Sequence, residues 1–329
     1  MARAHIADPE IVNKAYDARE HETTPCIACN QGCADLLSQN LAISCLTNPR
    51  AGKEKIWPKA NLVKANTSKP LLVVGGGPAG LEAAAVAGER GIEVTLVEAK
   101  SDIGGTLAWL KNMPLRKEFF NLIDSQKRRL ERSNVTIELN CPISTEILQE
   151  YKNSHIIWAG GANPRAEIFD NGEVAMTLEE ALASSNQLGD SIYLVDHLGT
   201  WSVPSVAEYF ADLGKKVTIV VPTGVLGWKI SIYSSFALKR RLREKNVQVI
   251  SGHRVKSFAN GFVEIEDLSL GKVSGSYQTN HVISSLAGSP NVPSEVADMP
   301  TIKMVGDSVS ARTALEAVYE GHETALLLS

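Results

Sequence analysis

The sequence predicts an α/β protein in which two Rossmann-like, doubly wound domains follow an irregular, cysteine-rich segment. Three observations support this fold class. From residue 70 onward, apolar strands alternate with helices, which is typical of parallel sheets. The first of these strands, LLVV, leads directly into the glycine-rich turn GGGPAG. Upstream of it, four of the five cysteines have the compact spacing C-x2-C-x3-C-x11-C.

The composition is that of a soluble globular protein and argues against several other classes. The length of 329 residues is enough for two domains. Hydrophobic residues make up 44% of the chain and charged residues 21%, so buried cores are expected. With 33 basic and 37 acidic residues the net charge is −4, which gives no electrostatic case for nucleic-acid binding. No apolar run approaches the roughly 18 residues that span a bilayer, so we expect no membrane association.

The N-terminus and the cysteine usage predict the cellular compartment. The first residues, MARAHIADPE, are mixed and charged, and they resemble neither a signal peptide nor a transit peptide. Four clustered cysteines and the isolated Cys141 do not resemble the framework of a secreted disulfide protein. We therefore expect a cytoplasmic protein.

Residues 1–69 are predicted to form an N-terminal arm and the cysteine segment. Apolar residues at helical spacing predict a helical arm over residues 1–20, with Asp8 as N-cap and Pro9 as the first helical residue. The rest of this region, up to about residue 68, has no period long enough for a stable core. So long an irregular stretch needs an additional restraint, and the cysteines supply a candidate.

Residues 70–165, together with 288–329, are predicted to form the first Rossmann-like domain. Strand LLVV, the helix after GGGPAG and strand EVTLVEA make a βαβ unit. In its turn, Gly75 permits the tight bend, Gly77 lets a pyrophosphate approach the backbone, and Gly80 lets helix and strand pack closely. The phosphates would lie over the helix N-terminus, where free N–H groups favour anions.

Glu98 strengthens the dinucleotide interpretation. It ends the second strand, eighteen residues after Gly80, where an acid can accept hydrogen bonds from ribose hydroxyls. The glycines alone are weak evidence, because a purely structural turn could use them too. With strand, helix, second strand and acid in register, the sequence predicts binding of an adenine dinucleotide or ADP.

Cys26, Cys29, Cys33 and Cys45 allow three interpretations: incidental thiols, a zinc site or an iron–sulfur cluster. Four thiols within twenty residues are too dense to be incidental. A structural four-cysteine zinc site usually comes as two C-x2-C hooks, whereas here three cysteines share one loop and the fourth follows at a distance. That arrangement favours a cubane cluster, and zinc stays open as the alternative.

Residues 166–287 are predicted to form the second Rossmann-like domain, whose turn lacks the glycine fingerprint. After strand SIYLVD the turn runs from His197 to Pro204, and only Gly199 could serve a phosphate. Trp201 is expected to occupy the space that a pyrophosphate needs. The sequence therefore predicts a degenerate lobe without a nicotinamide nucleotide, and an unusual NAD(P)H site stays open as the alternative.

Gly306 and Asp307 are predicted to lie between a strand and the last helix. Asp307 could accept hydrogen bonds from ribityl or phosphate-proximal hydroxyls, and the helix N-terminus could receive a phosphate. The alternative is that Asp307 or Ser308 only caps that helix. In a chain that also carries GGGPAG, cofactor contact is favoured.

No residue is predicted to act as an acid, base or nucleophile. His155, His253 and His281 stand apart in the sequence without an evident partner. The basic run KRRLR indicates the solvated face of a helix, and Cys141 is expected to be a small buried hydrophobe.

The chain resembles the C-terminal half of the trimethylamine dehydrogenase and 2,4-dienoyl-CoA reductase family. The motifs that carry the resemblance span essentially the whole chain: ARxxIADP, CIACNQGC, GGGPAG, IGG, AGGANPR, VDxxGTWxxPSVAE and a final GD followed by EGH. The resemblance implies a [4Fe-4S] cluster on the four clustered cysteines, followed by two nucleotide-binding-like domains. It also implies FAD, or ADP in the same site, held by Gly75, Gly77, Pro78, Ala79, Gly80, Glu98, Gly104, Gly105, Gly160, Gly306 and Asp307.

Two departures from that family matter. The family's N-terminal half is a TIM barrel that holds FMN and the substrate; a barrel needs about 200–250 residues, and only 25 precede Cys26. We therefore expect a separately encoded subunit or a fragment, and Met1 at the module junction favours the subunit. The reductase branch keeps a second glycine fingerprint for NADPH, so the turn after SIYLVD resembles the amine-dehydrogenase branch instead.

Three functions remain in consideration. The favoured one is an electron-transfer subunit: an FMN-containing TIM-barrel partner oxidises an amine or N-methyl compound, and this chain relays the electrons through the cluster to an acceptor such as an electron-transferring flavoprotein. The second is a free-standing NAD(P)H-dependent FAD and iron–sulfur reductase that resembles the small subunit of glutamate synthase. The third is a non-catalytic scaffold that binds ADP.

The favoured function also predicts where the partner binds. Because the donor flavin would lie on another chain, the segment from Cys26 to Cys45 is expected at the subunit interface, with the arm of residues 2–20 helping to dock it. Deleting that arm should then weaken assembly and leave the cluster intact.

Overall fold

The computed structural model describes residues 2–57, 64–297, 299 and 301–329. The chain divides into two compact units, Met1–Asn163 with Ser289–Ser329, and Pro164–Gly288. The predicted α/β class with parallel sheets is confirmed, because each unit contains a five-stranded parallel sheet. Within the described residues, no helix is both long and apolar enough to cross a membrane.

The sheet of the first unit has the strand order β15-β4-β1-β2-β3. Its strands are β1 (Leu71–Val74), β2 (Val94–Val97), β3 (Val135–Glu138), β4 (His155–Trp158) and β15 (Ile302–Met304). From the central β1 the chain runs outward to β2 and β3, then returns to the other side of β1 for β4. In open α/β sheets, ligands bind outside the carboxyl ends of the strands at such a reversal.

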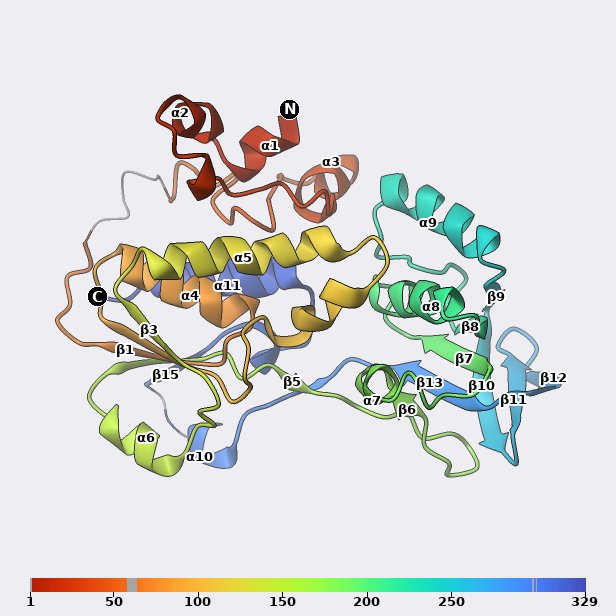
Figure 1. The fold of residues 1–329 in the computed structure, drawn as a ribbon. Helices are drawn as coiled ribbons and strands as arrows, with labels where there is room; N and C mark the ends of the chain where they lie inside the picture. The colour runs from red at the N-terminus through yellow and green to blue at the C-terminus, as the bar shows by residue number, and fades with distance from the viewer. Residues whose placement is uncertain (1, 58–63, 298, 300) are drawn as a thin grey trace. The chain divides into compact units, whose positions relative to one another are not determined.

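Three helices cover one face of this sheet: α4 (Pro78–Glu89), α5 (Lys117–Glu131) and α11 (Ala314–Leu326) (Figure 1). The shorter α6 (Thr145–Glu150) and α10 (Ser294–Ala297) lie at the opposite face (Figure 1). Two 3-10 turns, η4 (Gly105–Asn112) and η5 (Gly306–Ser308), complete the connections.

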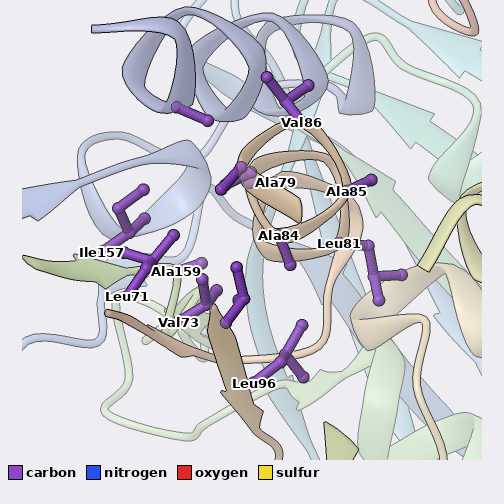
Figure 2. Packing of buried hydrophobic residues seen from close by; sticks show 14 of the residues in the cluster. Leu71, Val73, Ala79, Leu81, Ala84, Ala85, Val86, Leu96, Ile157 and Ala159 are labelled. Atoms are coloured by element: carbon purple, nitrogen blue, oxygen red, sulfur yellow. The ribbon is translucent and has the colours of Figure 1, made fainter. Parts of the chain in front are cut away.

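Helix α4 is the centre of the core in the first unit. Every residue from Ala79 to Gly88 is buried, since the helix packs on the sheet and is covered by its neighbours. Figure 2 shows Leu81 and Ala84 of α4 beside Val73 and Leu96 of the sheet. Small side chains on nearly every face of α4 allow this close packing all round.

The N-terminal region consists of short pieces: α1 (Ala2–Ala7), α2 (Ile11–Tyr16), η1 (Glu20–Glu22), a π-helical turn at Gln31–Asp35 and α3 (Leu36–Ser38). The expectation of one continuous helical arm is wrong, because the arm breaks at Asp8 and Pro9 between α1 and α2, and Glu10 is the residue that precedes α2. Proline disfavours a helical conformation in the residue before it. The buried Asp8 carboxylate accepts a hydrogen bond from the Glu10 N–H at 3.0 Å, the contact expected of a cap, and further ones from Lys14 and the Thr24 N–H.

The second unit has the parallel strand order β6-β13-β7-β8-β9. These strands are β6 (Met176–Thr177), β7 (Ser191–Asp196), β8 (Lys216–Val221), β9 (Gln248–Ser251) and β13 (His281–Ser285). The helices are α7 (Leu178–Ala183), α8 (Ser202–Asp212) and α9 (Ile232–Glu244). A three-stranded antiparallel sheet forms from β10 (His253–Ala259), β11 (Phe262–Asp267) and β12 (Lys272–Gln278).

Candidate functional site

The predicted dinucleotide residues gather at the carboxyl edge of the first sheet. Gly75 follows β1, Glu98 follows β2, Gly160 lies just beyond β4, and Gly306 lies just beyond β15. They come together because the carboxyl ends of parallel strands meet at one edge. The reversal of strand order between β1 and β4 lies at the same edge.

The three glycines of the turn differ in conformation and surroundings. Gly75 has φ +105°, a conformation that side chains rarely adopt. A Cβ on Gly80 would lie 1.9 Å from the carbonyl oxygen of Gly75, so helix and turn touch here. A Cβ on Gly77 would meet no atom closer than 3.9 Å. The missing side chain of Gly77 therefore serves no packing purpose and leaves space at the N-terminus of α4.

The turn is braced by the segment after β2. Glu98 is buried; its Oε2 accepts a hydrogen bond from the Gly76 N–H at 2.7 Å, and its Oε1 accepts one from the Lys100 N–H at 2.8 Å. The Gly104 N–H donates to the carbonyl of Gly76 at 2.8 Å, and Gly104 and Gly105 both have positive φ. Glu98 thus fixes the turn while keeping acceptor capacity for a ribose hydroxyl.

Gly160 and the Gly306–Asp307 pair complete this edge. A Cβ on Gly306 would lie 2.9 Å from the Cβ of Ala79, so this glycine packs against the glycine turn itself. A Cβ on Gly160 would lie 2.6 Å from the indole nitrogen of Trp158. Burial raises the pKa of Asp307, whose Oδ1 accepts the N–H of Arg312 at 3.1 Å.

The idea that Asp307 or Ser308 caps the last helix is wrong. Helix α11 begins at Ala314, and Thr313 caps it through a capping box with Glu316. Ser308 instead donates to the carbonyls of Trp158 and Val305. The residues between Asp307 and Thr313 separate the acid from the helix, so Asp307 is available for another role.

The four clustered cysteines line one small cavity. Cys26, Cys29 and Cys33 come from one loop, and Ser44 brings the fourth cysteine to them, because its N–H donates to the carbonyl of Gly32 at 2.6 Å. A Cβ on Gly32 would lie 2.6 Å from the carbonyl oxygen of Ser44. Glycine at position 32 is therefore what lets Cys45 join the triplet.

The arm also contributes to this cavity. Arg3 and Ile6 of α1 line it together with the cysteines, and the Asn48 side chain donates to the carbonyl of Ile6 at 2.8 Å. Removing residues 2–20 would open one wall of the cavity. This geometry argues against the expectation that deletion of the arm leaves a cluster intact.

Burial and mutual proximity affect the pKa values of the clustered thiols. Burial raises the pKa of Cys29 to about 11, and the charges of the other three thiols act in the same direction. Burial also raises the pKa of Cys45. All five cysteines of the chain are free. Among the described residues, no group of three or more His, Cys, Asp or Glu side chains could hold a metal ion.

In the second unit, the turn after β7 is closed by an indole that the sequence analysis did not single out. A Cβ on Gly199 would lie 2.2 Å from Nε1 of Trp228, and the N–H of Lys229 donates to the carbonyl of Gly199 at 3.0 Å. The sequence assigned this blocking role to Trp201. Trp228 lies 29 residues further along the chain, and no local pattern connects it to the turn.

A second group that the sequence did not reveal lies at the same sheet edge of the second unit. His197 Nε2 lies 2.9 Å from Glu167 Oε2, and the hydroxyl of Ser284 donates to that same oxygen at 2.5 Å. Burial raises the pKa of Glu167, but these hydrogen bonds outweigh it and the pKa is lowered overall. His197 and Ser284 both contact Glu167, which differs from the serine-to-histidine contact of a nucleophile pair.

Comparison with known proteins places this geometry among flavin enzymes. Residues 70–186 match the family model described as FAD dependent oxidoreductase. Over 258 residues the chain is 32% identical to the probable N-methylproline demethylase of Rhizobium meliloti, a match that covers 78% of this chain and 38% of that protein. It is 26% identical over 332 residues to the cinnamate reductase of Clostridium sporogenes, covering 99% of this chain and 49% of that protein.

A solved structure of an amine oxidase also resembles this chain over nearly its whole length. The 6-hydroxypseudooxynicotine amine oxidase of Pseudomonas geniculata has 25% sequence identity and a TM-score of 0.89 over 99% of this chain and 52% of that chain. This chain is related to flavin-dependent oxidoreductases. It spans only 38% to 52% of the length of these three relatives. The substrate and partners of a complete enzyme are therefore proposals.

The residues of the first unit fit the FAD of the family description. The open space at Gly77 lies at the N-terminus of α4, a helix of 12 residues whose first turn has no acidic side chain. Unpaired N–H groups at such a terminus attract a pyrophosphate. Glu98 and Asp307 lie on either side of the turn as acceptors for hydroxyl groups. FAD binding is supported, and the contact of each residue with it stays a prediction.

Proposed function

We propose that this chain is the electron-transfer subunit of an iron–sulfur flavoprotein that oxidises an amine or N-methyl compound. One observation carries the proposal. The four cysteines line a single cavity, and Ile27 and Leu46 beside them pack against Val318 of α11, the helix that also packs on the glycine turn. Both predicted redox sites thus contact one helix, an arrangement that is compatible with a relay.

A [4Fe-4S] cluster is the metal group we propose for the cysteines. A cubane has a separate iron for each of four thiolates, so its ligands surround a volume instead of converging on one ion. Three thiols on one loop, with the fourth from farther along the chain and all four lining one cavity, favour this arrangement over zinc. When bound, the cluster supplies one-electron transfer and the flavin supplies two-electron chemistry. The protein's own contribution is to hold the ligands, bury the sulfurs and exclude water.

The substrate side of the reaction is proposed to lie on another chain. An FMN-containing TIM-barrel partner would oxidise the substrate and dock at the cysteine segment, and an electron-transferring flavoprotein would accept the electrons. An amine or N-methyl substrate is supported by two relatives, the N-methylproline demethylase and the amine oxidase. The cinnamate reductase among the relatives keeps a reductive direction open as an alternative.

Two other functions make different demands on the structure. A free-standing reductase needs NAD(P)H in the second unit, and Trp228 against Gly199 argues against it. A scaffold needs only ADP in the first unit. The nucleotide released by denaturation separates these cases, because FAD supports a redox role and ADP a structural one.

Copurification tests the proposal as a whole. The full chain is affinity-purified without oxygen from its native host, and its bound cofactors and partners are identified. We expect iron, acid-labile sulfide, FAD and an FMN-binding barrel protein. A protein that carries one zinc, no sulfide and no barrel partner would refute the proposal.

A further inference from the structure

Helix α11 makes direct contact with both predicted cofactor sites. On one side, Val318 packs in a cluster with Ile27 and Leu46, which flank Cys26 and Cys45. One turn further, Gly321 packs on the glycine turn: a Cβ there would lie 2.2 Å from the carbonyl oxygen of Ala79. No side chain could be added at Gly321 without separating the two helices. A displacement of α11 would therefore shift residues at both predicted cofactor sites.

Beside Gly321, His322 enters a buried ionic network on α4. His322 Nδ1 lies 2.9 Å from Oε1 of Glu82, and Arg129 of α5 donates to Oε2 of the same carboxylate at 2.7 Å. Glu82 and His322 are each 2% exposed. Gln126 of α5 donates to Glu82 and to the carbonyl of Pro78, the first residue of α4. The network therefore reaches the N-terminal turn of the helix that would bind the dinucleotide.

The His322 ring also contacts Trp57, which follows the fourth cysteine in the N-terminal region. The ring of Trp57 lies 5.3 Å from the ring of His322 and 5.2 Å from that of Tyr319, measured between centroids. Lys53 lies 4.4 Å from the centroid of Tyr319 and donates to its hydroxyl at 2.8 Å. The segment that follows Cys45 therefore packs against α11 through aromatic and cation–π contacts.

The imidazole of His322 connects these two sets of contacts. Its Nδ1 is engaged by Glu82, while its Nε2 is buried and has no hydrogen-bond partner within the described residues. A buried nitrogen without a partner is costly, and an apolar ring would avoid that cost. Packing against Trp57 alone does not need an imidazole; the imidazole adds the contact with the Glu82 carboxylate.

We propose that α11 couples the two cofactor sites, with His322 as the positioning residue that transmits the coupling. The inference rests on the proposed function, since it assumes both a cluster and a flavin. A bound cluster holds the cysteine segment in place, Trp57 holds His322, and His322 with Glu82 holds the first turn of α4 in the conformation that accepts a pyrophosphate. Each cofactor then strengthens the binding of the other, because coupling between two binding sites is reciprocal.

The test compares FAD affinity in cluster-loaded and cluster-free forms of the full chain, the latter prepared by chelating the iron. The dissociation constant is measured anaerobically from the quenching of FAD fluorescence. In the wild type we expect the cluster-loaded form to bind FAD at least about fivefold more tightly, the lower end of measured couplings. A ratio near one in a protein that binds both cofactors would overturn the coupling and leave the proposed function standing.

Variants locate the coupling. His322→Phe keeps a ring beside Trp57 and removes the contact with Glu82; Trp57→Leu keeps that contact and removes the stack. Both should bring the ratio toward one. Leu327→Ala, at a residue 76% exposed at the end of the same helix, is the matched control and should keep the ratio of the wild type. If His322→Phe does not fold, the ratio of FAD affinities in Trp57→Leu still tests the coupling. If both variants keep the wild-type ratio, the role of His322 is refuted, and a wild type without cluster or FAD refutes the proposed function as well.

Discussion

Gly80 and Gly75 touch so closely that a Cβ on Gly80 would lie 1.9 Å from the carbonyl oxygen of Gly75. Gly77 lies three residues before Gly80, and a Cβ added to Gly77 would meet no atom closer than 3.9 Å. Two glycines of one turn therefore have different physical reasons for being glycine. Gly80 is needed to fold the turn, and Gly77 leaves room for a ligand.

This difference predicts a crossed pair of variants. Gly80→Ala should lower the free energy of unfolding by about 1–3 kcal/mol, because the added methyl group overpacks a closed contact. Gly77→Ala should leave the unfolding free energy near that of the wild type and weaken FAD binding roughly tenfold, or about 1.4 kcal/mol. Denaturant unfolding and FAD titration measure the two effects. Equal destabilisation by both variants would contradict the assignment.

Glu82 predicts how stability depends on pH. Burial alone raises the pKa of Glu82, but Arg129 and His322 outweigh it and lower the value from 4.5 to about 2. A carboxyl with a depressed pKa contributes stability that is fully present above its unfolded value and is lost as the pH falls through the folded value. The free energy of unfolding should therefore fall between about pH 4.5 and pH 2.

Glu82→Gln isolates that contribution. At pH 7 the variant should be less stable by about 3 kcal/mol or more, since it leaves Arg129 and His322 without their shared carboxylate. The difference from wild type should shrink as the pH is lowered toward 2. Glu179→Gln, at an exposed position of α7, is the control and should change little. A difference that stays constant with pH would show that Glu82 is not the titrating group.

The closed turn of the second unit predicts no reaction with nicotinamide nucleotides. NADH and NADPH should leave the absorbance of bound flavin unchanged under anaerobic conditions, because Trp228 occupies the position beside Gly199. Trp228→Ala alone should not create the activity, since the turn still has a single glycine for phosphate contact. Rapid bleaching of the wild-type flavin would favour the reductase alternative.

The sequence predicted those features that depend on neighbouring residues. The strand, turn and helix around GGGPAG and the position of Glu98 are local in the chain, and parallel pairing then brings Gly160 and Gly306 to the same edge. The spacing of the cysteines also indicated one shared site. Hydrophobic pattern and glycine placement carry this information without reference to distant parts of the chain.

Contacts between distant residues could not be predicted in this way. His322 meets Glu82, 240 positions earlier, and Trp228 reaches Gly199 from the next loop, so neither pairing leaves a periodic signal. The cap of the last helix was not predicted either: the sequence analysis considered Asp307 or Ser308 as the alternative cap, whereas Thr313 and Glu316 form the capping box that starts α11. The break at Pro9 shows proline overriding an apolar pattern of helical spacing.

The cysteines themselves allow a matched pair of variants. Cys45→Ser should abolish incorporation of iron and acid-labile sulfide, because it removes the ligand that the Gly32 contact brings to the triplet. Cys141→Ser, outside the cavity, should keep both. Colorimetric iron and sulfide assays on anaerobically reconstituted protein make the comparison. Equal loss in both variants would point to instability and not to ligation.

Metal analysis of the wild-type chain, purified without oxygen, tests the central claim most directly. Iron, acid-labile sulfide and zinc are measured per chain, with a low-temperature EPR spectrum after reduction. The account predicts about four iron and four sulfide per chain and the signal of a reduced [4Fe-4S] cluster. One zinc per chain with no sulfide and no EPR signal would contradict it.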